Sequence, residues 1–326
     1  MESQPLVSVV IPAYNRAALL REAVASVLAQ SYAAFELIVV DDGSTDATAA
    51  FLRTAREVRL VRQDHLGMPG QARNAGARVA RGEYLAFLDS DDLWLPHKLA
   101  VQVAAAAAAG DAINHTRERW LRGGRVISQR GQRHRRSGDL FADSLRKCII
   151  GPSTVLLRRE VFEAAGGFRE DLEIAEDYEL WLRLTARHPV GYVERESVIK
   201  RAGHGDQLSE RYGHIELFRL HALRGLLEQD HRQHDKAAPA HIRAVGSIRP
   251  NVWQEGVATA CFTPRQRAAA AAELARKARI YAAGCRKRGR TTEADRYDAL
   301  AQQWAATCGA AAGTPGTGAP GAGRNP

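Results

Sequence analysis

Three carboxylates stand within four residues at the end of a hydrophobic segment. The segment 84–88 (YLAFL) is followed directly by Asp89, Ser90, Asp91 and Asp92. Like charges at this spacing repel each other and raise one another's pKa values. A divalent cation offsets the repulsion, because Mg²⁺ and Mn²⁺ bind carboxylate oxygens, commonly beside substrate phosphates. The pattern therefore favours a metal site, and its alternative is a solvated acidic turn that caps the next helix.

A second pair of carboxylates, Asp41-Asp42, follows the apolar segment 36–40 (ELIVV). A carboxylate at the end of a parallel strand can accept hydrogen bonds from the base or ribose of a nucleotide. A capping turn is one alternative. Phosphoacceptor chemistry is another, but it requires a single aspartate on a later strand and a lysine beyond it, and neither is evident.

Other candidates lie further along the chain. Arg73, in GQARNAG, could reach a phosphate or a base, or be a surface arginine. Glu176-Asp177 begin a predicted helix, whose dipole favours an anion there, and an ionised carboxylate can act as a general base. The alternative is an ordinary acid at a helix start. His204, in RAGHGDQLS, could bind a metal or a phosphate oxygen, or be a surface-loop histidine.

Alternating strands and helices position these residues. Strands are predicted at 6–11, 36–40, 58–62 and 84–88, and helices at 17–29, 47–55 and 70–79. Near-continuous apolar strands are typical of a parallel sheet covered on both faces, where ligands bind outside the carboxyl ends of the strands. The polar clusters fall at those ends, at 12–16, 41–46 and 89–92.

The rest of the chain is predicted to mix strands and helices. We expect a hairpin or loop at 114–136, a strand at 154–157, helices at 161–165 and 175–186, and an edge strand at 190–193. The pattern is helical from about residue 215, with a helical hairpin at 265–283 and 292–306. The final residues, 309–326, have the composition of a disordered tail.

The chain has 326 residues, a net charge of +9 and a pI of about 9.7, which favours anionic partners. The arginine-rich stretch 117–136 could hold a phosphate or an anionic acceptor, or be a solvated loop. Nucleic acid is disfavoured as a partner, because Trp120 is the only large aromatic residue in that stretch.

Four scattered cysteines without CxxC spacing predict reduced thiols in a cytosolic protein. We expect no signal peptide at the N-terminus, and no apolar stretch approaches the roughly 20 residues of a spanning helix. A membrane-spanning helix is therefore not expected, whereas peripheral docking on a membrane stays open.

Several segments together resemble a known family. VSVVIPAYNR, SVLAQSY, ELIVVDDGSTDAT, GQARNAGARVARGEYLAFLDSDD, GGF and EDYELWLRL are similar to successive blocks of the family-2 glycosyltransferases. The resemblance runs from about Val7 to Ser209 and implies an α/β protein with the GT-A fold, a Rossmann-like, mostly parallel sheet flanked by helices. It implies a glycosyltransferase domain at 1–214, with a nucleotide-binding half (1–100) and an acceptor half (101–214), followed by a helical region at 215–308.

The resemblance also implies roles for the matching positions. Pro12, Ala13 and Tyr14 would line the base pocket, and Asp42 would contact the base. Arg73 would lie beside the base or phosphates. Asp89, with Ser90, would hold the ribose side, and Asp91 would bind Mn²⁺ or Mg²⁺ with Asp89 and His204 as further candidates. Asp177 would be the catalytic base, and Glu176 is the second candidate for that role.

The implied reaction is an inverting transfer of the hexosyltransferase type from a nucleoside diphosphate sugar, expected to be a UDP-sugar. The acceptor would be a carbohydrate or lipid-linked hydroxyl in cell-envelope polysaccharide, glycolipid or glycoprotein assembly. Basic residues at 117–136 and 285–290 suggest contact with an anionic membrane at its cytoplasmic face. One alternative is a nucleotidyltransferase, but that class requires a glycine-rich phosphate loop after the first strand, and the segment PAYNR is not one. The other alternative is a non-catalytic module that binds nucleotide sugars.

Overall fold

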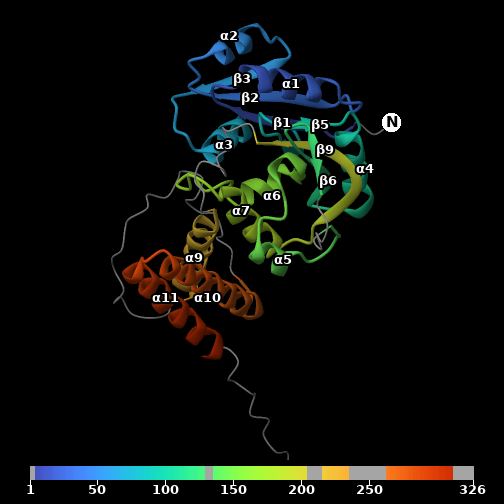
Figure 1. The fold of residues 1–326 in the computed structure, drawn as a ribbon. Helices are drawn as coiled ribbons and strands as arrows, with labels where there is room; N and C mark the ends of the chain where they lie inside the picture. Colours follow the sequence, from blue (N-terminus) through green and yellow to red (C-terminus); the bar gives the residue numbers. More distant parts are fainter. Residues whose placement is uncertain (1–3, 129–134, 204–214, 235–261, 311–326) are drawn as a thin grey trace, which may run out of the picture. The chain divides into compact units, whose positions relative to one another are not determined.

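The structure is a computed structural model, and it describes residues 4–128, 135–203, 215–234 and 262–310 (Figure 1). The chain divides into two compact units, Met1–Cys261 and Phe262–Pro326. Helix α9 (Ile215–His234), which the sequence groups with the C-terminal helices, falls within the first unit. Each unit is described by itself.

The N-terminal half of the sheet is parallel, as the alternation of strands and helices predicts. Its strands lie in the order β3-β2-β1-β4. Their bounds are β1 (Val7–Ala13), β2 (Phe35–Asp42), β3 (Val58–Gln63) and β4 (Tyr84–Phe87). The connecting helices are α1 (Ala17–Leu28), α2 (Ala47–Thr54) and α3 (Pro69–Val79).

The other half makes the sheet mixed. Beyond β4 the order continues β8-β6-β9-β5, and β7 pairs with β6. The pairs β4–β8, β6–β8, β5–β9 and β6–β7 are antiparallel, and only β6–β9 is parallel there. The bounds are β5 (Leu93–Trp94), β6 (Ile113–Arg122), β7 (Arg125–Ile127), β8 (Val155–Arg158) and β9 (Gly191–Ala202).

The strand predicted at 190–193 is the beginning of a longer one, because β9 extends to Ala202. Residues 191–193 pair with β6, and β5 pairs with β9 only further along, at Val198 and Ile199. Its sequence, GYVERESVIKRA, groups charged residues as ERE and KR around the apolar pair Val198-Ile199, so no simple alternation marks its full length. The sequence pattern therefore did not show how far the strand runs or which neighbours pair with its backbone.

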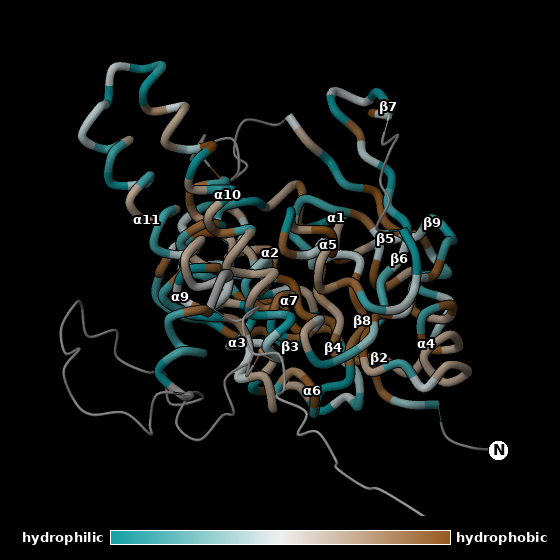
Figure 2. The backbone as a smooth tube through the Cα atoms, turned by 90° about the horizontal axis from the view of Figure 1, so that it is seen from below, coloured by the Kyte–Doolittle hydropathy of each residue, from teal (hydrophilic) through white to brown (hydrophobic). Residues whose placement is uncertain are grey.

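Both faces of the sheet are covered. Val7, Val9 and Ile11 of β1 belong to a core cluster that includes residues of α1 and of α4 (Lys98–Ala109). Val10, on the opposite face, belongs to a second cluster with residues of α3 and of α7 (Glu176–Thr185). Figure 2 shows these hydrophobic segments gathered in the strands and the inner helices. The shorter helices are α5 (Phe141–Arg146), η1 (Pro152–Thr154) and α6 (Arg159–Ala164).

The second unit contains the predicted helical pair, α10 (Pro264–Lys287) and α11 (Thr291–Ala310). Thr263 begins α10 with a capping box to Gln266. The rings of Tyr281 and Tyr297 pack edge to face between the helices, with centroids 4.6 Å apart. Among the described residues of both units, no helix is long and apolar enough to cross a membrane.

Candidate active site

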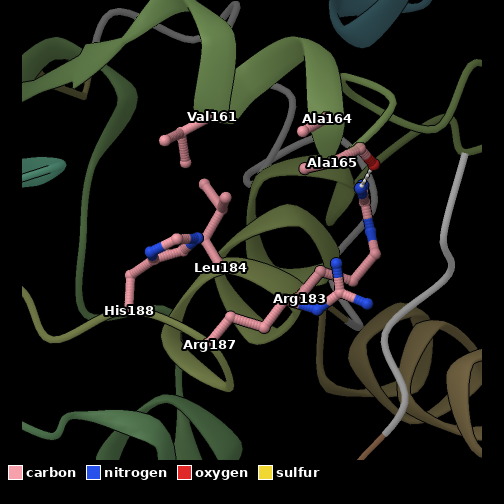
Figure 3. A pocket seen from close by; sticks show the side chains of 7 residues that line it. All are labelled: Val161, Ala164, Ala165, Arg183, Leu184, Arg187 and His188. Carbon is pink, nitrogen blue, oxygen red and sulfur yellow. Dashed lines mark hydrogen bonds between the residues drawn. The ribbon is translucent and has the colours of Figure 1, made fainter.

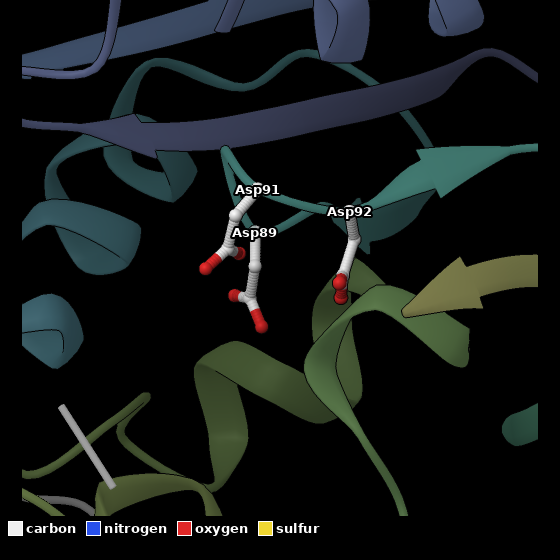
Figure 4. A group of neighbouring side chains, drawn as sticks. All are labelled: Asp89, Asp91 and Asp92. Carbon is white, nitrogen blue, oxygen red and sulfur yellow. The ribbon is translucent and has the colours of Figure 1, made fainter. Parts of the chain in front are cut away.

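The three carboxylates that follow β4 lie together in the loop that leads to β5 (Figure 4). One ligand oxygen from each of Asp89, Asp91 and Asp92 lies within 4.8 Å of the others. Asp89 and Asp91 are half-buried and point the same way in Figure 4, whereas Asp92 is fully buried and stands nearer to β5.

Each of these carboxylates contacts a cation of the protein. Arg73 donates from Nη2 to Asp89 Oδ1 at 2.7 Å, and Arg16 donates from Nη1 to Asp91 Oδ2 at 2.8 Å. The Nζ of Lys200 lies 3.8 Å from Asp89 Oδ2 and 3.5 Å from Asp92 Oδ2. Burial alone would raise the pKa of Asp89, but the charges of Arg73 and Lys200 outweigh burial and lower it.

Asp92 supports the loop. Its Oδ2 accepts a hydrogen bond from Ser153 Oγ at 2.6 Å, and its Oδ1 accepts one from the Arg201 backbone N–H at 3.2 Å. Burial, with the charges of Asp89 and Asp91, raises the pKa of Asp92 to about 7, although Lys200 opposes the rise. Both oxygens already serve protein donors, so Asp92 holds the loop in place.

The chemistry of the donor set fits a hard divalent cation, because carboxylate oxygens are the ligands that Mg²⁺ and Mn²⁺ prefer. Asp91 and Asp89 would hold it, since both are half-buried and neighbouring. His204 lies outside the described residues.

Arg73 joins this cluster to the start of α7. Its Nη1 donates to Glu176 Oε1 at 2.6 Å while its Nη2 holds Asp89. The guanidinium is buried, and its carbon lies 5.3 Å from the centroid of the Phe168 ring. The side chain that the sequence assigned to a base or phosphate thus lies between two carboxylates.

Glu176 and Asp177 begin α7 directly after Ala175, whose backbone has a φ of 68°. Burial raises the pKa of Glu176 to about 7, and the charge of Asp177 adds to the rise while Arg73 opposes it. Asp177 is half-buried, and its Oδ1 accepts from the Tyr178 N–H at 2.6 Å. The thiol of Cys148 lies 3.3 Å from Asp177 Oδ2.

Asp42, at the end of β2, is held by several donors. Gln63 Nε2 donates to its Oδ1 at 2.6 Å, and His65 Nδ1 lies 2.9 Å from its Oδ2. The ring of His65 stacks on Tyr14 with centroids 3.6 Å apart and an angle of 11°. Tyr14 is exposed, so the end of β1 presents an aromatic pair beside a carboxylate.

The remaining candidates lie nearby, at the end of β1 and in the acidic loop. Pro12 and Ala13 are the last residues of β1 and pair with Val40 and Asp41 of β2. Ser90 is buried between Asp89 and Asp91.

Sequence reasoning missed Lys200, His65, Ser153 and Cys148 as parts of this site. Each comes from a segment without a recognisable motif, and only pairing in space brings it to the cluster. The register of β6 and β9 places Lys200 opposite Trp120, whose ring centroid lies 5.9 Å from Nζ. A lysine in a strand rich in charged residues carries no local signal for that position.

A separate small hollow lies between α6 and α7 (Figure 3). Its space of about 30 Å³ is lined by Val161, Ala164, Ala165, Arg183, Leu184, Arg187 and His188. Arg183 crosses one side and donates to the carbonyl of Ala165. A volume of this size holds about one water molecule. None of the candidate site residues lines it.

Comparison with known proteins gives consistent results. Residues 8–166 match the model of the family described as Glycosyl transferase family 2. An uncharacterized glycosyltransferase of Rickettsia felis is 31% identical over 192 residues, which are 58% of this chain and 32% of the relative. An uncharacterized protein of Mycobacterium tuberculosis is 33% identical over 217 residues, which are 61% of this chain and 68% of the relative. The chain thus spans about a third of the Rickettsia felis relative's length.

Among solved structures, Staphylococcus aureus TarS 1–349 in complex with UDP-GlcNAc superposes with a TM-score of 0.57 at 16% identity. The match covers 92% of each chain. This likeness confirms the predicted α/β class and GT-A fold, with helices after the sheet. The matched segment and the sequence relatives establish that the chain belongs to glycosyl transferase family 2.

Proposed function

We propose that this protein is an inverting, metal-dependent glycosyltransferase that moves a sugar from a UDP-sugar to an acceptor hydroxyl. The observation that carries the proposal is the buried bridge through Arg73, which joins Asp89 of the acidic loop to Glu176 at the start of α7. A single side chain thereby ties the candidate diphosphate-and-metal centre to the start of α7, where Asp177, the candidate general base, follows Glu176.

The donor nucleotide binds across the ends of β1 and β2. Tyr14 and His65 offer a stacked aromatic surface to the base, and Asp42, which holds His65 at 2.9 Å, lies at its edge. Pro12 and Ala13 form the adjoining wall, and Asp89 with Ser90 faces the ribose. The complex of TarS with UDP-GlcNAc supports a uridine nucleotide as the first donor to test.

The diphosphate lies over the acidic loop. A divalent cation bound by Asp91 and Asp89 would stabilise the negative charge that builds on the leaving nucleoside diphosphate. Lys200, 3.8 Å from Asp89, supplies a fixed positive charge to the same place. Its pKa is raised by Asp92 and Asp89 despite its burial, so it stays protonated at neutral pH.

Asp177 acts as the general base. It accepts the proton of the acceptor hydroxyl while the hydroxyl oxygen bonds to the anomeric carbon and the bond from that carbon to the diphosphate breaks. Attack and departure on opposite faces invert the anomeric centre. Glu176 is held by Arg73 at 2.6 Å, so it positions the helix and leaves the proton transfer to Asp177.

The acceptor is a carbohydrate or lipid-linked hydroxyl in the assembly of cell-envelope polysaccharide. The exposed arginines of the hairpin formed by β6 and β7 favour an acceptor presented at an anionic membrane surface. The protein would act at the cytoplasmic face of that membrane. Nucleic acid is not an expected partner.

Release of nucleoside diphosphate from UDP-, GDP- and dTDP-sugars tests the proposal, with the wild type compared with Asp91→Asn and Asp177→Asn. Each variant is expected to lose turnover by about 10²-fold or more. Glu57→Gln, at an exposed acid before β3, is the matched control and keeps wild-type turnover. Wild-type turnover by either aspartate variant would remove that residue from its assigned role.

A further inference from the structure

We propose that Arg16 is an internal counterion of the metal site. Its guanidinium forms an ion pair with the Asp91 carboxylate before the donor binds, and binds the diphosphate of the donor afterwards. The nucleotide and the divalent cation therefore bind cooperatively. The inference rests on the function proposed above. It assigns to Arg16 the role of coupling the binding of the nucleotide to the binding of the divalent cation.

The fold places Arg16 beside Asp91. Arg16 follows β1 and Asp91 follows β4, and these two strands pair in parallel, so their carboxyl ends lie side by side. The Nη1 to Oδ2 distance is 2.8 Å, and the two side chains are only 20% and 13% exposed. A cation that is to bind Asp91 at this oxygen must therefore displace a partly desolvated guanidinium.

The backbone at Arg16 is anchored independently of Asp91. Its N–H donates to Thr48 Oγ1 at 2.9 Å. Asn15, which precedes it at a φ of 48°, accepts from the Thr45 N–H at 2.8 Å. The Arg16 side chain can thus move away from Asp91 while its own backbone stays in place.

The other cations of the cluster are less suited to such an exchange. Arg73 is 6% exposed and holds Asp89 and Glu176 at once, so its departure would leave two carboxylates without it. Lys200 lies between Asp89 and Asp92. Arg16 reaches the loop from the neighbouring carboxyl end of β1, and a guanidinium can bind phosphate oxygens in a forked geometry as it can a carboxylate.

This exchange has a thermodynamic consequence. If Arg16 competes with the cation at Asp91, the nucleotide that draws Arg16 away strengthens cation binding. By reciprocity, the cation strengthens nucleotide binding by the same factor. Removing the guanidinium then improves cation binding without nucleotide and reduces the coupling between the two ligands.

Binding of Mn²⁺ by the full-length chain tests the proposal, with free Mn²⁺ measured by electron paramagnetic resonance with and without UDP. Arg16→Gln is expected to bind Mn²⁺ about tenfold more tightly than the wild type without UDP, and UDP is expected to improve its affinity less. Arg21→Gln is the matched control, because Arg21 lies on α1 with its guanidinium carbon 4.3 Å from the Phe51 ring centroid. It should bind Mn²⁺ as the wild type does.

The outcomes separate this inference from the proposed function. If the wild type and Arg16→Gln bind Mn²⁺ equally, and both bind it more tightly with UDP, the counterion role of Arg16 is wrong and the metal site stands. Weaker binding by Arg16→Gln would also overturn it. If neither the wild type nor the variants bind Mn²⁺ even with UDP, the proposed metal dependence is wrong, and the inference about Arg16 is wrong as well. Circular dichroism of each variant checks that its fold is retained.

Discussion

At the scale of single residues, Arg73 determines how the two acidic centres are arranged. Its guanidinium is buried and binds Asp89 at 2.7 Å and Glu176 at 2.6 Å. Replacing one partner of a buried ion pair leaves an uncompensated charge and costs about 3–5 kcal/mol. Arg73 therefore stabilises the fold, and it also fixes the position of Asp89 relative to the start of α7.

The pKa of Glu176 makes stability depend on pH. It rises from an ordinary value of 4.5 to about 7 in the folded protein. Between these values the folded state binds more protons than the unfolded state, so the free energy of unfolding falls as the pH rises and levels off above about 7. The contribution has a slope of at most about 1.4 kcal/mol per pH unit.

Urea unfolding at pH 5, 6, 7 and 8 measures this slope, with Glu176→Gln compared with the wild type. The variant keeps the shape of the side chain and an acceptor for Arg73, but it does not titrate, so its stability should fall less between pH 5 and 7. Glu57→Gln, at an exposed site, should follow the wild type. Parallel curves for wild type and Glu176→Gln would contradict the raised pKa.

Short motifs made part of the site predictable. Asp89 and Asp91 stand in one motif, and Glu176 and Asp177 in another, because neighbours in sequence share a strand end or a helix start. The positions of Lys200 and Cys148 at the site could not be predicted in this way. They reach the cluster through the register of β9 and through a loop before η1, and their local sequences do not encode either contact.

At the scale of elements, α3 is positioned by its close approach to β1. A Cβ atom on Gly76 would lie 2.4 Å from Cγ1 of Val10 and 3.1 Å from Cγ2 of Val40. The helix also carries Asn74, whose Nδ2 donates to the Phe168 carbonyl at 2.8 Å. These contacts set the height of α3 on the sheet, and therefore the position of Arg73 above β4.

Gly76→Ala is expected to destabilise the first unit by about 1–2 kcal/mol. Overpacking against Val10 costs about 1–3 kcal/mol, and the better helix propensity of alanine offsets up to about 1 kcal/mol. Chemical denaturation followed by circular dichroism measures the change. Gly284→Ala on α10 is the control, because it would meet only the outer atoms of the Arg288 side chain. It should be neutral or stabilising, and a neutral Gly76→Ala would disprove the close packing.

The parallel half of the sheet was predictable because most of its strands are near-continuous apolar runs separated by helices. In the other half, the strand expected at 154–157 corresponds to β8, whereas β5 has only two residues and was not predicted. The hairpin of β6 and β7 was indicated by Gly123 and Gly124, both of which adopt positive φ. Its pairing with β9 depends on contacts between residues far apart in sequence.

At the scale of the whole molecule, one surface combines positive charge with exposed hydrophobic side chains. The hairpin of β6 and β7, which projects at the top of Figure 2, carries Arg122 and Arg125 at exposed positions. Beside them, Val126 is 65% exposed and Ile127 is 36% exposed. Basic residues next to exposed apolar ones are suited to the interface of an anionic bilayer.

Co-sedimentation with liposomes tests this surface. The wild type should sediment with vesicles that contain anionic phospholipid and not with neutral ones, and salt should weaken the binding. Val126→Asp should reduce binding, because it places a negative charge among the arginines. Ile280→Asp, at a 58% exposed position of α10, is the control and should bind as the wild type does. If binding does not depend on the charge of the lipid, or if Val126→Asp binds as the wild type does, the hairpin is not the membrane contact.

The most direct test of the account is a thermal-shift panel of UDP, GDP, dTDP and CMP, each with and without Mn²⁺. A ligand that binds only the folded state raises the melting temperature by mass action. We predict a shift for UDP that increases with Mn²⁺ and loses this increase in Asp91→Asn. Two results would contradict the assignment of the acidic loop as the metal-dependent donor site. One is that no nucleotide raises the melting temperature, and the other is that UDP raises it equally with and without Mn²⁺ and in Asp91→Asn.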